Sequence, residues 1–140
     1  MSFQQIIIQA LVKADIQTAW NCYNNPDHIT QWNFASDEWW CPMATNDLRV
    51  GGSFTSRMEA KDGSFGFDFE GVYTDVVEFK HLVYLMADGR SVRVQFTESG
   101  DHTDVEVQFD AEDQNSLDMQ RAGWQAILNN FKKHTESISS

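Results

Sequence analysis

The spacing of apolar and polar positions changes along the chain, and each spacing predicts a different kind of element. Residues 4–12 are rich in Ile, Leu and Val, which is typical of a β-strand. Apolar positions then recur every three or four residues between residues 15 and 32, and Asn24-Asn25-Pro26 interrupts them, so we expect two short helices. From residue 47 to residue 109 short alternating runs predict antiparallel strands with one apolar and one wet face. Turn signals separate these runs at Lys61-Asp62-Gly63, Asp88-Gly89 and Ser99-Gly100-Asp101.

Residues 33–47 fit neither spacing. Aromatic residues and Pro42 are scattered there among polar ones, so we expect a long irregular connection. In the strands that follow, Gly51, Gly52 and Gly71 lie where a side chain would be expected, and they predict bends or bulges in the sheet.

The final stretch, from about Ser116 to Ser137, predicts a long helix with Ser116 as its N-cap. At 1.5 Å per residue the helix would be about 30 Å long, enough to lie across a whole sheet. One stripe of mainly apolar residues runs along it at spacings of three and four: Gln120, Trp124, Ile127, Leu128, Phe131 and Thr135.

An apolar sheet face and an apolar helix stripe must bury each other. The sequence therefore predicts one α+β domain over residues 1–140. In it, a curved antiparallel sheet of about six to seven strands wraps around the C-terminal helix, and two short helices follow the first strand.

This order of elements, together with particular residues, resembles the START-like (SRPBCC, helix-grip) superfamily. Within it, the chain is similar to the branch related to the C-terminal domain of the activator of Hsp90 ATPase. The residues that carry the resemblance are Trp20, Pro26, Trp32, the stretch Asp47-Leu48-Arg49-Val50-Gly51-Gly52-Ser53-Phe54, Phe69-Glu70-Gly71, Gly123-Trp124-Gln125-Ala126-Ile127-Leu128 and Phe131. The resemblance implies a cavity for a hydrophobic ligand between sheet and long helix, since most members hold one and a minority are cyclases. It also implies an Hsp90-type chaperone as a second kind of partner.

Composition adds weight to an apolar interior. Hydrophobic residues make up 41% of the chain and aromatic residues 13%, with 10 Phe and 5 Trp. So many rings must fill a core or line a cavity, because a small surface exposes few of them.

The formal charge of −11 disfavours phosphate backbones and anionic membranes, so we expect neither nucleic acid nor membrane as a partner. No apolar run approaches the roughly 20 residues that span a bilayer, and the N-terminus lacks the features of a signal peptide. A cytoplasmic location is therefore expected, with Cys22 and Cys41 as free thiols.

The residue types that could perform catalysis or bind a metal form no known motif in this sequence. Cys and His residues are scattered without the spacing of a metal motif, and no nucleophile motif is present, so we expect no metal, no cofactor and no catalytic residue. Asp68 and Glu70 alternate with Phe67 and Phe69, so we expect the acids to face solvent, beside Arg57 and Glu59. The opposite phase would place the acids in the cavity and favour acid–base catalysis.

The candidate binding residues are aromatic or aliphatic, apart from one amide. Gln120 could orient a ligand oxygen or lie at the solvent edge of the helix. The sheet candidates are Phe54, Met58, Phe67, Phe69, Val94, Phe96 and Val107, the helix candidates are Gln120, Trp124, Ile127 and Phe131, and the rim candidates are Trp32, Phe34, Trp39 and Trp40. The alternative for all of them is simple core packing.

Three functions remain open from the sequence. The first is non-catalytic binding of a small hydrophobic molecule, by a monomer or weak homodimer. The second is a protein-interaction role such as activation of an Hsp90-type chaperone ATPase, which exposed Trp39 and Trp40 would favour. The third is an enzyme of the cyclase or hydrolase kind, which requires an acid inside the cavity.

Overall fold

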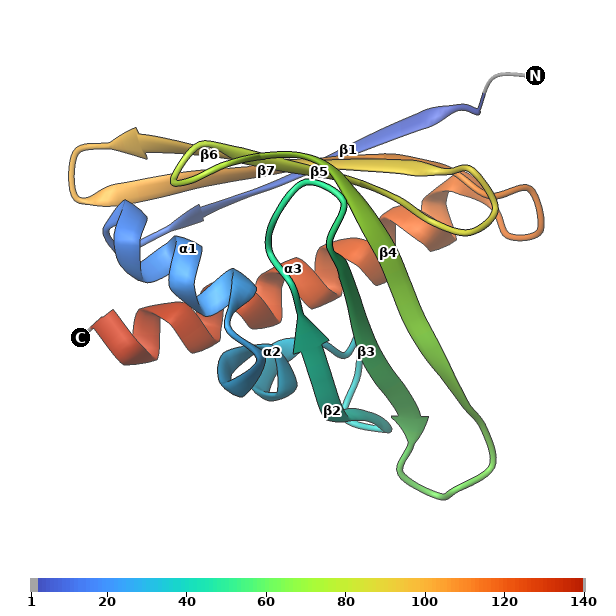
Figure 1. Ribbon diagram of the computed structural model, residues 1–140. Coiled ribbons are helices and arrows are strands. Elements are labelled where there is room, and N and C mark those ends of the chain that lie inside the picture. The colour runs from blue at the N-terminus through green and yellow to red at the C-terminus, as the bar shows by residue number, and fades with distance from the viewer. Residues whose placement is uncertain (1–2, 140) are drawn as a thin grey trace.

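The computed structural model describes residues 3–139, and within them one antiparallel sheet of seven strands lies over three helices (Figure 1). The elements in chain order are β1 (Gln5–Val12), α1 (Ile16–Asn24), α2 (Pro26–Trp32), β2 (Trp39–Asn46), β3 (Ser53–Ala60), β4 (Gly66–Val77), β5 (His81–Leu85), β6 (Ser91–Ser99), β7 (His102–Asp110) and α3 (Leu117–Ser139). The strand order across the sheet is β1-β7-β6-β5-β4-β3-β2. This arrangement confirms the predicted α+β helix-grip fold.

Each helix begins at the predicted residue because a side chain caps it. Asp15 accepts a hydrogen bond from the Thr18 backbone N–H at 2.7 Å, and Ser116 Oγ accepts one from the Met119 N–H at 3.1 Å. Pro26 is the first residue of α2, after its N-cap Asn25. Helix α3 continues beyond the predicted end, and Ser140 lies outside the described residues. Among residues 3–139, no helix combines the length and apolarity needed to cross a bilayer.

The predicted irregular connection over residues 33–47 is wrong for most of its length, because residues from Trp39 onward form the edge strand β2. This strand pairs with β3 alone, and its register shifts between Trp40 and Met43, around Pro42. Proline has no N–H to donate and is tolerated in a sheet mainly at an edge or a bulge. Pro42 hides the strand in the sequence because it breaks the alternating pattern. It is tolerated there because β2 is the edge strand.

The bend predicted at Gly71 takes a different form from a bulge. Gly71 pairs directly with Phe54 in β3, and the register shift falls two residues later, between Tyr73 and Asp75. A Cβ at position 71 would lie 2.7 Å from the Phe54 ring and 2.8 Å from the Tyr84 ring. Glycine is therefore required here because two rings inside the molecule approach the backbone closely.

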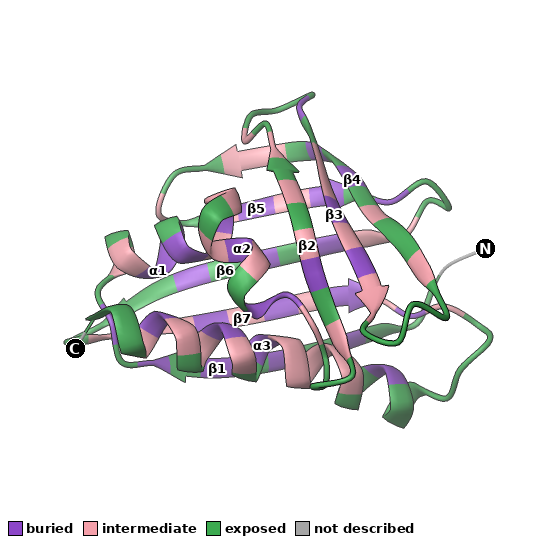
Figure 2. Cartoon of the chain, turned by 90° about the horizontal axis from the view of Figure 1, so that it is seen from below, coloured by how far each residue is buried: buried purple, intermediate pink, exposed green. Residues whose placement is uncertain are grey.

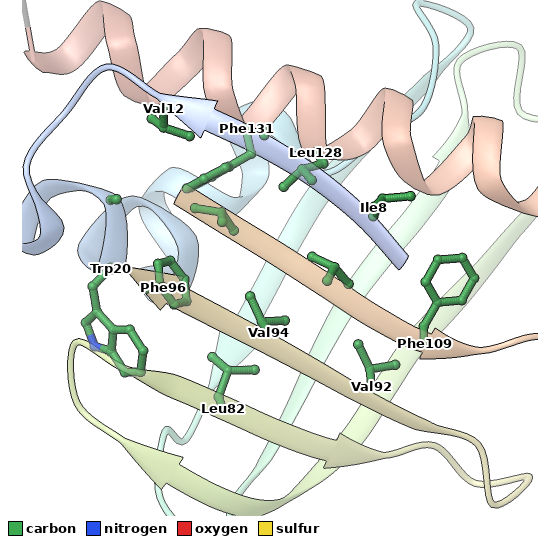
Figure 3. Close-up of a cluster of buried hydrophobic side chains, with 14 of the residues drawn as sticks. Ile8, Val12, Trp20, Leu82, Val92, Val94, Phe96, Phe109, Leu128 and Phe131 are labelled. Atoms are coloured by element: carbon green, nitrogen blue, oxygen red, sulfur yellow. The ribbon is translucent and has the colours of Figure 1, made fainter. Parts of the chain in front are cut away.

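The bent sheet has a packed half and an open half. In the packed half, β1, β5, β6 and β7 bury their inner side chains against α1 and α3 (Figure 3). Phe131 of α3 is fully buried there, and Trp20 of α1 packs edge-on to Phe96 at 5.0 Å between ring centroids. Strands β2, β3 and β4 bend away from this core (Figure 1), and the space beneath them is the candidate site.

Candidate ligand cavity

A cavity of about 290 Å³ lies between the inner face of the bent sheet and helices α2 and α3. Figure 2 views the molecule from this side, with half-buried residues on β2, β3 and the helices. The lining residues are Ile8, Tyr23, Asn24, Ile29, Trp32, Asn33, Asn46, Phe54, Ser56, Met58, Phe67, Phe69, Tyr73, Leu82, Tyr84, Met86, Arg90, Val107, Trp124, Ile127 and Leu128.

Aromatic rings form much of the cavity wall, and they meet at steep angles. Phe54 packs edge-on to Tyr84 with ring centroids 4.7 Å apart, and Phe69 packs edge-on to Trp124 at 6.1 Å. Trp124 is held from behind by Phe109, which stacks on it at 4.0 Å. Rings fixed in this way form an apolar wall whose members hold one another in place.

All three tyrosines of the chain line the cavity. The Tyr73 hydroxyl donates to Asn46 Oδ1 at 2.6 Å. The hydroxyls of Tyr23 and Tyr84 form no hydrogen bond within residues 3–139. Burial raises the pKa of Tyr23, Tyr73 and Tyr84, so all three remain neutral hydrogen-bond donors near pH 7.

Arg90 supplies the one charged side chain that lines the cavity among the described residues. Its Nε donates to Asp88 Oδ2 at 2.7 Å. Its positive charge acts to lower the pKa of Tyr84, although burial of that ring outweighs the effect. A polar group of a ligand would therefore find a phenol donor and a cation close together.

Asp68 and Glu70 face solvent, as the alternation of β4 predicts. Arg57 Nη1 lies 3.3 Å from Asp68 Oδ1 and Arg57 Nε lies 3.0 Å from Glu59 Oε2, in partly exposed surface pairs that contribute little to stability. Within residues 3–139, no carboxylate lines the cavity. Acid–base catalysis by the sheet acids, the requirement of the enzyme hypothesis, thus has no support from their placement.

The structure brings together eight of the residues proposed from the sequence. Those that line the cavity are Trp32, Phe54, Met58, Phe67, Phe69, Val107, Trp124 and Ile127. Trp32 was placed at the rim, but it is buried in the wall, and its Nε1 donates to the Cys22 carbonyl at 2.9 Å. Val94, Phe96 and Phe131 lie instead in the packed core, where simple packing explains them.

Gln120 takes neither of the roles considered for it. Its Oε1 accepts from the Glu112 N–H at 2.9 Å, and its Nε2 donates to the carbonyls of Glu112 and Asn115. The amide is buried and fully engaged in holding the connection between β7 and α3. It therefore acts on the backbone of its own chain and does not face the cavity.

The remaining rim candidates lie outside the cavity. Phe34 is half-buried, and its carbonyl accepts from Asn130 Nδ2 at 2.6 Å. Trp39 packs on Phe65 and Phe67, each at 6.0 Å, at the end of the sheet. Trp40 points away and is 45% exposed.

Sequence reasoning missed the polar part of the lining, which consists of the three tyrosines, Asn24, Asn33, Asn46, Ser56 and Arg90. A signal for two of them was present, because Tyr73 continues the inward phase of Phe69 and Tyr84 lies between inward Leu82 and Met86. Tyr23 and Asn46 come from α1 and β2, whose orientation over the sheet no local pattern reveals.

The bent sheet, the long helix and the apolar cavity between them define a START-like, helix-grip protein. The chain belongs to the family described as Activator of Hsp90 ATPase homolog 1-like protein, whose model matches residues 13–136. None of the curated proteins matches this sequence.

Several solved structures are similar over nearly the whole chain. The AHSA1-like protein of Aeromonas hydrophila is 44% identical with a TM-score of 0.90, covering 96% of this chain and 94% of its own. Protein Chr148 of Cytophaga hutchinsonii is 47% identical with a TM-score of 0.83, covering 96% and 93%. Protein NE0264 of Nitrosomonas europaea is 16% identical with a TM-score of 0.82 over 96% and 95%, which shows the shared fold alone.

Proposed function

We propose that this protein binds a small, mainly apolar molecule in the cavity under β3 and β4, without transforming it. The observation that carries the proposal is the cavity of about 290 Å³ with rigid aromatic walls. Well-packed cores leave few voids larger than a water molecule. This cavity is partly open to solvent, so its apolar walls are hydrated until an apolar ligand covers them, and covering them is favourable.

The volume limits the size of the ligand. An apolar cavity of about 150 Å³ accommodates benzene, so 290 Å³ suits a molecule of about two fused rings. Ligand sites usually span about 300–1,000 Å³, which places this cavity at the small end. A compact cyclic ligand therefore fits better than a sterol or a long acyl chain.

The polar lining limits the chemistry of the ligand. The hydroxyls of Tyr23 and Tyr84 are neutral donors without partners within residues 3–139, and the Arg90 guanidinium lies near Tyr84. A ligand that left these donors unpaired would forfeit their hydrogen bonds. The ligand is thus expected to carry an acceptor oxygen, such as a phenol, ketone or carboxylate, at one end of an apolar body.

Two measurements test the proposal. Native mass spectrometry of the purified protein, followed by organic extraction, should reveal a small added mass that is released on unfolding. Isothermal titration calorimetry with 2-naphthol, a two-ring molecule with one oxygen, should give binding at one site. Filling the cavity by Ile127→Trp should weaken that binding at least tenfold.

Ala122→Trp is the matched control, because Ala122 is exposed on the same helix and does not line the cavity. It should bind 2-naphthol as the parent protein does. Binding that survives Ile127→Trp unchanged would place the ligand elsewhere. A clean apo mass together with no heat of binding would count against the proposal altogether.

A second candidate function is activation of an Hsp90-type chaperone, which the family description suggests. The observation that favours it is the aromatic cluster of Trp39, Phe65 and Phe67 at the free end of β3 and β4, where Phe65 is 60% exposed. Rigid aromatic side chains anchor many interfaces.

The ATPase rate of a bacterial Hsp90-type chaperone, measured with and without this protein, tests that function. An activator should raise the rate, and Phe65→Ala should reduce the effect while Ile127→Trp should leave it intact. No change in rate with the parent protein would dismiss this candidate and would leave cavity binding untouched.

A further inference from the structure

Three side chains from three different helices meet within the helical layer. Cys22 lies on α1, His28 on α2 and His134 on α3, and their ligand atoms all lie within 4.8 Å of one another. His28 Nδ1 and His134 Nε2 are 2.9 Å apart. One sulfur and two imidazole nitrogens thus converge on one small volume.

A buried hydroxyl at the same place lacks a partner. Thr135 is fully buried, and its Oγ1 forms no hydrogen bond with any atom of residues 3–139. The Cys22 thiol, a weak hydrogen-bonding group, lies beside this hydroxyl, and Thr135 acts to lower the pKa of that thiol. Thr135 therefore adds a buried polar atom next to the Cys22 sulfur.

The three donor atoms are of kinds that transition metals prefer. A metal ion that binds the Cys22 sulfur must displace the thiol proton. Neutral imidazole and thiolate are ligands of Zn²⁺, Co²⁺ and Cu²⁺, whereas Mg²⁺ and Ca²⁺ prefer oxygen.

We infer that Cys22, His28 and His134 form a binding site for one divalent transition-metal ion such as Zn²⁺, with water in the fourth position. Tetrahedral zinc at about 2.0–2.1 Å from each nitrogen separates two ligand nitrogens by roughly 3.3 Å. The observed 2.9 Å therefore has to widen by a few tenths of an ångström, which small rotations of two half-buried rings provide.

This inference reverses the expectation of no metal. Local sequence motifs find metal sites whose ligands lie on one turn or one helix. Here position 134 is more than a hundred residues from position 22 in the chain, and only the packing of α3 beneath α1 and α2 brings them together.

Cobalt provides a direct optical test that does not depend on any cavity ligand. Co²⁺ titrated into metal-stripped, reduced protein should give a thiolate-to-cobalt charge-transfer band and intense visible bands typical of tetrahedral coordination, saturating at one equivalent. Zn²⁺ should then displace the cobalt. Cys22→Ser should abolish the charge-transfer band, and His28→Gln should weaken cobalt binding at least tenfold.

Cys41→Ser is the matched control, because Cys41 is equally buried but donates to the Met43 carbonyl and lies outside the cluster. It should leave the cobalt spectrum unchanged. The half-buried His28 variant keeps the test valid even where Cys22→Ser disturbs packing. A parent protein without cobalt absorption, or one whose bands persist in Cys22→Ser, would overturn the inference.

Discussion

At the centre of the molecule, the choice of residue at position 71 is limited by neighbouring aromatic rings and not by backbone conformation. Gly71 lies in a regular stretch of β4, yet its place opposite Phe54 leaves no room for a methyl group. Gly123 differs, since a Cβ there would meet nothing within 4 Å. The two glycines therefore make a matched pair.

Gly71→Ala should destabilise the protein by about 1–3 kcal/mol, the usual range for overpacking an interior. Phe54 and Tyr84 both line the cavity, so displacing their rings should also weaken the binding of 2-naphthol. Gly123→Ala should stabilise by up to about 1 kcal/mol, because alanine favours the helix interior. Urea unfolding measures both, and equal effects of the two substitutions would refute the packing argument.

Elements that are fixed by local chemistry were predictable, and those fixed by tertiary contacts were not. The turns at Gly63, Gly89 and Gly100 all adopt positive φ and close the hairpins where the sequence indicates. The edge strand β2 was missed because its pattern is broken at Pro42 and it pairs on one side only.

Helix α1 offers a test of local chemistry, because its N-cap carries a charge. Hydrogen bonds from the side chain and backbone N–H of Thr18 lower the pKa of Asp15. A carboxyl whose pKa is lower in the folded than in the unfolded protein stabilises the folded state at pH values above its unfolded pKa of about 3.9. This stabilisation is lost as the pH falls through the folded pKa.

Asp15→Ala should therefore cost about 1 kcal/mol at pH 7 and less at pH 3. Asp15→Asn, which retains a capping oxygen without the charge, should be close to the parent protein at pH 7 and should show no acid dependence from this position. Thermal unfolding at several pH values compares the three proteins. A penalty for Asp15→Ala that stays constant down to pH 2 would contradict the role of the carboxylate.

At the scale of the whole molecule, the apolar part of the site followed from the sequence and its polar part did not. The alternation along β3 and β4 predicts that Phe54 and Phe69 face inward, and the helical spacing along α3 predicts the same for Trp124. All three line the cavity. The polar groups Tyr23 and Asn46 reach the cavity from α1 and β2. Their positions depend on how these elements pack over the bend, which is a long-range property of the chain.

The same division into a packed and an open half predicts how the molecule opens. Strand β7 lies between β1 and β6, and its residues Val105 and Val107 are buried. Strand β2 is the opposite edge of the sheet, and its outward residue Met43 is 60% exposed. Local opening is easiest where few apolar contacts are lost.

Hydrogen exchange should therefore show the amides of Val105 and Val107 exchanging only on global unfolding, and the paired amides of β2 exchanging orders of magnitude faster. Saturating 2-naphthol should slow exchange in β3 and β4, which line the cavity, and should slow β7 only by the global stabilisation of about 2.7 kcal/mol at 100 times Kd. Among the described residues of β2, Asn46 alone lines the cavity. Amides at the other end of β2, near Trp39, should therefore still exchange fast. Uniform protection across all seven strands, with or without 2-naphthol, would mean that the bent half of the sheet is no looser than the core and that 2-naphthol does not act selectively on β3 and β4.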